Sequence, residues 1–140
     1  MPFHPYLFFG GNCREAFTRY QEIFGGELQL IRMGDTPDAD DVAPEQADLI
    51  IHAALIYDDH LLMASDDPMS AVFGPVQGMM VSYEAADAAD ARRVYAELAE
   101  GGEVTQDLME TPFSPTFGMC VDRFGTPWMI SAPGPEGAAA

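Results

Sequence analysis

Histidine and cysteine are the residue types in this sequence best suited to proton transfer, metal binding or nucleophilic chemistry. His52 lies within an otherwise apolar stretch, LIIHAALIY. Three roles are open to an imidazole at this position: a general base, a hydrogen-bond donor to a ligand, or a core residue whose polar atoms are satisfied. His60 follows two aspartates in a turn-like DDH sequence and is expected to be solvated. His52 is therefore the histidine with the greater functional potential.

The two cysteines, Cys13 and Cys120, allow at most one disulfide and have no paired metal-binding spacing such as CxxC. We expect both to be reduced thiols of a cytoplasmic protein. Cys13 follows the start of an expected helix, where the dipole would lower its thiol pKa; the alternative is a small residue beside the cap. The absence of GxSxG, GxxxxGK[ST] and GxGxxG motifs leaves a serine-hydrolase elbow and a phosphate-cradling loop unsupported.

Acidic residues dominate the charge: 23 Asp and Glu face six arginines and no lysine among 140 residues, giving a formal net charge of −17. Such a surface repels nucleic acids and anionic membranes but admits neutral or cationic small molecules. Genome composition and solubility are an alternative explanation of the acidity. We expect neither a signal peptide nor a membrane span, because no apolar run has the length or flanks of either.

The two halves of the chain repeat one order of sequence patterns. Residues 1–66 contain YLFFGGN, EAFTRYQEIFGGEL, LIIHAALIY and LLMAS, and residues 75–132 contain GMMVSYEAAD, DARRVYAELAEGGEV, TFGMCVDRF and PWMIS. Each half predicts a strand, an amphipathic helix, a Gly-Gly-Glu turn and three further strands. We therefore predict one domain over 1–132, with an α+β fold of two tandem βαβββ modules, and a disordered tail over 133–140.

Helix and turn signals mark the boundaries of these elements. Asn12 and Asp87 are expected to cap the two helix N-termini with their side chains, and the Gly-Gly pairs at 25–26 and 101–102 to end the helices. The dipeptides at 58–59 and 124–125 are expected hairpin turns. Residues 34–48 form a long acidic segment without an apolar period, which predicts a loop.

The phrases PYLFFGGNCREAFTRYQEIFGGEL, IIHAALIYDDHLLMASD, LAEGGEV and FGMCVDRFGTPWMIS together span Pro5 to Ser131. They resemble the PhnB-like group of the vicinal oxygen chelate superfamily, which includes glyoxalase I, bleomycin-resistance proteins, fosfomycin-resistance enzymes and extradiol dioxygenases. The resemblance implies two half-barrels around a shared cavity and a homodimer. In metal-using relatives, ligands from the first and last strand of each module hold a divalent ion. That ion binds two substrate oxygens and stabilises an enolate or alkoxide.

Residue by residue, the resemblance leaves this chain with an incomplete ligand set. His4 occupies the first ligand position, whereas Gly78 falls at the equivalent position of the second module. The acidic positions near the module ends are Met63 and Met129, whose thioethers suit Cu(I) and not the divalent ions of the family. We therefore expect no metal cofactor, with a weakly held divalent metal at His4 as the alternative.

The resemblance and the period-two alternation of strands together imply a set of cavity-facing side chains. That set is His4, Tyr6, Phe8, Ile50, His52, Ala54, Met63, Ser65, Met80, Ser82, Cys120, Met129 and Ser131. Leu7, Phe9, Val81, Trp128 and Ile130 are expected to pack under the helices. A lining of Met, Phe and Tyr suits a flat apolar or aromatic ligand, although each methionine taken singly is also an ordinary core filler.

The segment before the seventh strand departs from the pattern that it resembles. PhnB-like proteins tend to carry an ETFW-type stretch followed by a histidine. Here Pro112 is inserted, Phe113 stands at the aromatic position and is expected to line the ligand pocket, and no histidine follows. An activity that depends on that histidine is not expected. Glu110 is the best carboxylate candidate at the pocket rim, with an exposed loop glutamate as the alternative.

PhnB-like sequences are often labelled as ubiquinone-pathway methyltransferases. The sequence does not support that label, because we find no Gly-rich strand-to-helix turn for S-adenosylmethionine and the chain is too short for a doubly wound sheet.

Three functions remain open at this point. The first is metal-independent binding of a small apolar or aromatic molecule, cationic ones included, as in a sequestering protein of the bleomycin-resistance type. The second is an enzyme: a glyoxalase-like isomerase or lyase using His4 and cavity groups around a weak metal site, or a metal-free proton-transfer enzyme using His52 as base, with Glu110 as a further catalytic candidate. The third is a structural or interaction module with a collapsed cavity. The expected partners are a small-molecule ligand and a second copy of the chain, and neither nucleic acid nor a membrane.

Overall fold

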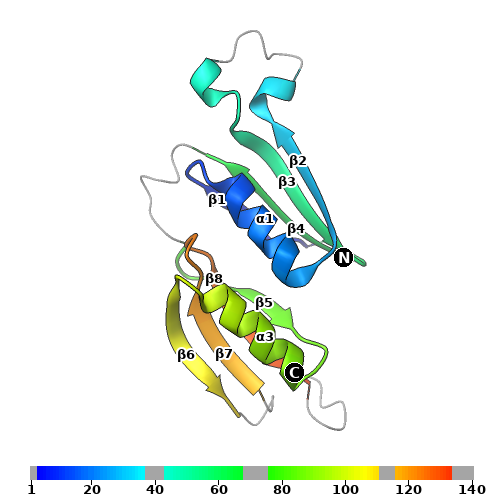
Figure 1. Ribbon diagram of the computed structural model, residues 1–140, viewed down its shortest axis with the longest axis vertical. Helices are drawn as coiled ribbons and strands as arrows, with labels where there is room; N and C mark the ends of the chain where they lie inside the picture. Colours follow the sequence, from blue (N-terminus) through cyan, green and yellow to red (C-terminus); the bar gives the residue numbers. More distant parts are fainter. Residues whose placement is uncertain (1–2, 37–42, 68–75, 111–115, 134–140) are drawn as a thin grey trace. The chain divides into compact units, whose positions relative to one another are not determined.

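The structure is a computed structural model that describes residues 3–36, 43–67, 76–110 and 116–133 (Figure 1). The chain divides into two compact units, Met1–Gly74 and Pro75–Ala140. The first contains β1 (Tyr6–Phe9), α1 (Cys13–Phe24), β2 (Glu27–Arg32), β3 (Ile50–Tyr57) and β4 (His60–Asp66). The second contains β5 (Val81–Glu84), α3 (Ala88–Ala99), β6 (Glu103–Met109), β7 (Thr116–Val121) and β8 (Pro127–Ala132). The predicted α+β fold with two βαβββ modules in tandem is confirmed.

Each unit folds into a four-stranded mixed sheet with one helix on one face. The strand orders are β1-β4-β3-β2 and β5-β8-β7-β6, so the two sheets have the same topology. The pairs β1–β4 and β5–β8 are parallel and the remaining pairs are antiparallel. In the first unit α1 packs on β2, β3 and β4, and in the second α3 packs on β6, β7 and β8 (Figure 1). Each sheet therefore has a helix-covered face and an opposite face, here called the open face.

Apolar stripes attach each helix to its sheet. The buried residues of the helices are Cys13, Ala16, Phe17, Tyr20 and Ile23 on α1, and Ala91, Val94, Tyr95 and Leu98 on α3. Phe17 packs edge-on against Phe9 of β1 and against Tyr20, with ring centroids 6.1 Å and 5.4 Å apart. Such edge-to-face pairs stabilise a core beyond the apolar area that they bury.

The two helices are capped in different ways. Asp87 accepts a hydrogen bond from the backbone N–H of Asp90 at 2.8 Å, as predicted. The prediction for Asn12 is wrong, because its side chain makes no capping hydrogen bond. Instead, Oδ1 of Asp66, at the end of β4, accepts from the N–H groups of Gly11 (3.1 Å) and Cys13 (2.9 Å). A carboxylate at a helix N-terminus satisfies free N–H groups and interacts favourably with the helix dipole, wherever in the chain it comes from.

The Gly-Gly pairs end both helices, as predicted. Gly25 and Gly101 adopt φ angles of 78° and 75°, which are accessible to glycine at little cost. The second glycine of each pair has a different role. A Cβ on Gly26 would collide with the carbonyl oxygen of Ile56, and one on Gly102 with that of Val121. The repeated glycines therefore allow the chain after each helix to approach the neighbouring strand closely.

The two hairpins differ in length. Tyr57 pairs with His60, so Asp58 and Asp59 form the predicted two-residue turn. In the second unit Val121 pairs with Pro127, which makes the loop longer than the two-residue turn expected at 124–125. The buried carboxylate of Asp122 organises this loop. It accepts hydrogen bonds from the N–H groups of residues 124 (2.9 Å) and 126 (3.0 Å) and from Nε1 of Trp128 (2.8 Å).

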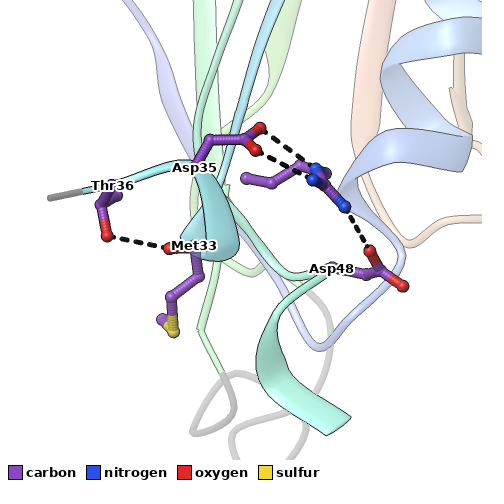
Figure 2. A network of polar contacts seen from close by, with 5 residues as sticks. Met33, Asp35, Thr36 and Asp48 are labelled. Atoms are coloured by element: carbon purple, nitrogen blue, oxygen red, sulfur yellow. Dashed lines mark hydrogen bonds and ion pairs between the residues drawn. The ribbon is translucent and has the colours of Figure 1, made fainter. Parts of the chain in front are cut away.

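The acidic segment after β2 contains two short 3-10 helices, η1 (Met33–Asp35) and η3 (Pro44–Gln46), in place of the uninterrupted loop that we expected. The guanidinium group of Arg32 lies between Asp35 and Asp48, with N–O distances of 2.8 Å to each (Figure 2). Its hydrogen bonds hold the pKa of Asp35 below the ordinary value. Arg32 therefore joins the two ends of this segment. Of the predicted tail, 134–140 lies outside the described residues.

Candidate functional site

Side chains from β1 and β4 form the centre of the open face of the first sheet. Tyr6 pairs with Met63 and Phe8 with Ser65, so these four residues share one face. The exposed fractions of Tyr6 and Phe8 are 38% and 55%, compared with 3% and 4% for Leu7 and Phe9. The alternation places Leu7 and Phe9 under α1, as expected, and leaves two aromatic side chains accessible to a ligand.

His52 extends this group from β3. Its ring centroid lies 6.0 Å from that of Tyr6, with a 37° angle between the planes, and its Nδ1 atom lies 3.4 Å from the Tyr6 hydroxyl oxygen. The Tyr6 and Phe8 centroids lie 5.3 Å apart at 45°. We call Tyr6, Phe8 and His52 the aromatic cluster. It combines two exposed rings with one imidazole on a single sheet face.

Met63, Ser65 and Ala54 surround the cluster. Ala54 pairs with Met63, so both lie on the open face. Ile50, which we expected on the same face, is fully buried, and its N–H group donates to Asp66 Oδ2 at 2.8 Å. The reason is a register shift between Ile31 and Arg32 of β2, which pair with residues 52 and 50 and so interrupt the simple alternation.

His4 precedes β1 and is half-buried. The adjacent Pro5 carbonyl accepts a hydrogen bond from the N–H of Met63 at 3.1 Å, so His4 lies at the start of the β1–β4 pair. No ring contact or hydrogen bond of His4 to the aromatic cluster is seen in the described part of the chain.

The open face of the second sheet carries different side chains. Met129 pairs with both Ser82 and Met119, and Ser131 pairs with Phe117. Met80, half-buried, precedes β5. Sequence reasoning missed Met119 and Phe117, although the alternation along β7 was the signal that could have identified them. This face also carries the exposed carboxylate of Glu84, which pairs with Ser131, so it combines soft apolar side chains, hydroxyls and an acid, and its described residues include no imidazole.

Cys120 lies on the helix-covered face, contrary to our expectation. It pairs with Trp128 and is fully buried. A two-residue turn at 124–125 would have paired it with Met129. The longer loop shifts the register by one residue, and such a shift moves a side chain to the other face. Cys120 also contributes to raising the pKa of the Tyr95 hydroxyl of α3, after the larger effect of burial. Cys120 is therefore a core residue and lines no pocket on the open face.

The thiols are free and poorly suited to nucleophilic chemistry. Burial, and secondarily the charge of Asp66, raises the pKa of Cys13 to about 12. Burial, together with Asp122, raises that of Cys120 to about 11. The lowered pKa that we considered for Cys13 is therefore wrong, because the thiol is buried and, secondarily, because the cap of the helix N-terminus is itself an anion. Both groups are neutral thiols at neutral pH.

The remaining candidates are less informative. Glu110 directly follows β6 and is exposed. Phe113 lies outside the described residues.

The positions that hold metal in relatives do not fit a divalent ion in this chain. Met63 and Met129 supply thioethers. The expected equivalence of His4 with Gly78 is wrong: Tyr6 pairs with Met63 and Ser82 with Met129, so the residue that corresponds to His4 is Met80, a third thioether. Within the described ranges no group of three or more His, Cys, Asp or Glu side chains is arranged to hold a metal ion. His4 remains the one ligand-type residue at those four positions.

In the same ranges, no helix is long and apolar enough to cross a membrane.

Residues 2–131 match the family model described as 3-demethylubiquinone-9 3-methyltransferase. The chain belongs to this family. It is 32% identical over 142 residues to protein YjdN of Escherichia coli K12, covering 94% of this chain and 95% of YjdN. The crystal structure of protein PA1353 from Pseudomonas aeruginosa has a TM-score of 0.84 at 38% identity, covering 94% and 97% of the two chains.

A third match has the same fold at lower identity. It is a Bacillus cereus protein described as a putative 3-demethylubiquinone-9 3-methyltransferase, PhnB protein, with a TM-score of 0.76, 22% identity, and coverage of 94% and 99%. The resemblance noted in the sequence is confirmed at the level of family and fold: the family model spans nearly the whole chain, and the fold is shared with the Bacillus cereus PhnB protein and with a glyoxalase/bleomycin resistance protein/dioxygenase family enzyme from Burkholderia phytofirmans (TM-score 0.59, 15% identity, coverage of 91% and 95%).

One reason that we gave against the methyltransferase label, the lack of a Gly-rich strand-to-helix turn, is wrong. A Gly-rich strand-to-helix turn does exist, since residues 10 and 11 are glycines between β1 and α1. However, the N–H groups of Gly11 and Cys13 at this turn bind the carboxylate of Asp66. An internal anion thus occupies the donors that such a turn would offer to a ligand.

Proposed function

We propose that this PhnB-like protein binds a small apolar or aromatic molecule, cationic ones included, on the open face of its first sheet and without the usual metal centre. The observation that carries the proposal is the aromatic cluster. Tyr6 and Phe8 are exposed on adjacent positions of one face and lie 5.3 Å apart. Flat apolar molecules bind by covering such rings, with typical gains of about 0.5–1.5 kcal/mol per aromatic pair beyond the buried area.

Charge supports the inclusion of cationic ligands. The chain carries a net charge of −17, and an acidic surface raises the local concentration of cations. The attraction is long-ranged and therefore weakens as salt is added. Neutral aromatic ligands would bind with little dependence on salt.

The metal-free part of the proposal is supported by the donor set. Thioethers at 63, 80 and 129 stand at the positions where the resemblance implies metal ligands in relatives. The open face offers instead an imidazole, a phenol and a hydroxyl, which recognise ligands by hydrogen bonds.

One contact bears on a second candidate, a proton-transfer enzyme with His52 as general base, which requires Nδ1–H to donate to the Tyr6 oxygen so that Nε2 carries no proton. Nδ1 of His52 faces the Tyr6 hydroxyl at 3.4 Å, and a base held by a second polar group is a recurrent catalytic arrangement. A glyoxalase-like reaction at a weak metal site on His4 has no comparable contact in the described part of the chain.

Equilibrium dialysis tests the leading proposal. The probes are proflavine, a flat cation, and naphthalene, a flat neutral molecule. We expect both to bind the wild type and Phe8→Ala to weaken both about tenfold, since it removes the most exposed ring of the cluster. Tyr57→Ala is the matched control, because Tyr57 is a similarly exposed aromatic residue (47%) at the far end of β3. Equal effects of the two substitutions, or no binding, would contradict the proposal.

Three further measurements test its other parts. Raising the salt concentration should weaken proflavine binding and leave naphthalene unchanged. Elemental analysis of protein purified without chelator or affinity tag should give well under one metal ion per chain. A stoichiometric divalent metal would overturn the metal-free part. Sedimentation analysis tests the homodimer, which we retain as part of the proposal.

A further inference from the structure

We infer that His52 donates a hydrogen bond from Nε2 to the bound molecule and that Tyr6 holds it in this state, so that the site selects flat aromatic ligands carrying an uncharged oxygen acceptor, such as a ring carbonyl. The inference rests on the proposed function, because it names the ligand class of the same open face. It also assigns separate roles to two members of the aromatic cluster.

The direction of the Tyr6–His52 hydrogen bond decides which nitrogen of the imidazole carries the proton. The phenolic oxygen and Nδ1 are 3.4 Å apart, a long hydrogen bond. A phenol is a good O–H donor and a weak acceptor, since its oxygen lone pair is delocalised into the ring, whereas an unprotonated imidazole nitrogen is a good acceptor. The favoured arrangement therefore has the Tyr6 hydroxyl donating to Nδ1.

The second step follows from the chemistry of neutral imidazole, which carries one proton on its two nitrogens. If Nδ1 accepts, the proton resides on Nε2. Nε2 is then a donor and cannot accept a proton from a substrate. Tyr6 thus disfavours the general-base role of His52 and favours ligand recognition.

The third step concerns the surroundings of the imidazole. His52 is half-buried on β3 and pairs across the sheet with Ile31, which is 44% exposed. Its ring also faces that of Tyr6. A flat ligand covering these apolar surfaces would remove water from the imidazole edge. An N–H left without an acceptor in such a complex is costly, so ligands with a matching oxygen are preferred over isosteres without one.

The ligand oxygen that accepts from Nε2 of His52 is expected to be uncharged. A carboxylate or phosphate would be repelled by a chain with net charge −17. A carbonyl or ether oxygen meets the same N–H without that penalty. The expected class is therefore a neutral or cationic aromatic molecule with a ring carbonyl.

The experiment compares coumarin, a flat bicyclic carbonyl compound, with naphthalene, a flat bicyclic hydrocarbon, by equilibrium dialysis at about pH 8.5, where an ordinary imidazole is neutral. We expect the wild type to bind coumarin at least tenfold more tightly than naphthalene. His52→Phe keeps a ring but removes the N–H, and should bring the two affinities together while retaining naphthalene binding. Tyr6→Phe should reduce the coumarin preference about threefold.

A spectroscopic readout separates the positioning role of Tyr6 from a structural one. Nitrogen-15 NMR of the His52 ring should show the proton on Nε2 in the wild type and a mixture of the two tautomers in Tyr6→Phe. Tyr57→Phe is the matched control and should change neither the tautomer nor the affinities.

The outcomes separate the two levels of the proposal. If neither molecule binds, the proposed function fails, and this inference fails with it. If both bind equally to the wild type, or if His52→Phe keeps the coumarin preference, this inference alone is overturned. A wild-type His52 protonated on Nδ1 would overturn the role assigned to Tyr6.

Discussion

The two units share strand order and register, but within each unit the carboxylates that stabilise the fold lie at different places. In the first unit, Asp66 at the end of β4 caps α1 and also binds the N–H of Ile50. In the second, Asp87 caps its own helix and Asp122 organises the β7–β8 loop. The difference shows that the shared topology depends on the repeated apolar stripes and glycines. The polar contacts of these carboxylates are particular to each unit.

The open faces diverge in the same way. The first presents two exposed aromatic rings and an imidazole, and the second presents Met119, Met129 and Ser131 at comparable positions. Methionine adapts to many shapes and supplies little directional recognition. The groups on which the proposed recognition depends, two exposed rings and an imidazole, are therefore a property of the first unit and are not repeated in the described part of the second.

Asp122→Ala should have the largest effect of the substitutions that separate the units. Its side chain is 5% exposed and accepts three hydrogen bonds, one of them from the Trp128 indole. Removing it leaves buried N–H donors without an acceptor, which should lower the free energy of unfolding by about 3 kcal/mol. Urea denaturation followed by tryptophan fluorescence measures the loss. Asp59→Ala in the exposed turn of the first unit is the control and should change the free energy by less than about 0.5 kcal/mol.

Removing either helix cap should lower the free energy of unfolding by less than Asp122→Ala does, and the two caps should differ from each other. Asp66→Ala removes three hydrogen bonds joining β4 to the start of α1 and to β3, and should cost about 2 kcal/mol. Asp87→Ala removes one local cap and should cost about 1 kcal/mol. Urea denaturation monitored by circular dichroism gives both values. An equal or larger loss for Asp87→Ala would contradict the view that the first unit relies on the longer-range cap.

The smallest effect, absent at neutral pH, concerns the thiols. A thiol whose pKa is raised by folding contributes stability below its ordinary pKa, and this stability is lost as pH rises towards the folded value. The window runs from about 9 to about 11 for Cys120 and to about 12 for Cys13. Cys120→Ala and Cys13→Ala should each make the unfolding free energy less sensitive to pH above 9. Urea denaturation at a series of pH values above 9 measures this change, and the larger reduction is expected for Cys13→Ala, because the folded pKa of Cys13 lies further above the ordinary value. The reverse order would contradict this difference between the units.

Much of the fold could be predicted from the sequence because its signals are local and repeated. Apolar spacing at 91, 94, 95 and 98 and the glycines after each helix locate the elements within each unit. Alternation along β1 likewise identifies the two exposed aromatic residues of the cluster. These features depend on residues a few positions apart, which is the range over which sequence patterns are informative.

The predictions that were wrong concern features that depend on contacts between distant segments. Nothing near Asn12 indicates that Asp66 caps the helix, since the two lie on different elements. Cys120 was assigned to the wrong face because the loop length, and hence the register, is decided by the hydrogen bonds of Asp122. The Tyr6–His52 contact joins residues separated by 46 positions, so alternation could suggest a shared face but not the hydrogen bond.

The position of the Asp66 carboxylate also bears on the order in which the protein folds as it is synthesised. Asp87 precedes α3 directly, so that helix has its cap as soon as its first turn leaves the ribosome. The cap of α1 arrives 53 residues after Cys13, once β4 has been made. The first helix therefore gains its full stability only with a long-range contact, and such contacts slow folding because a long loop must close first. The N-terminal unit, although synthesised first, depends on its own last strand to complete its first helix.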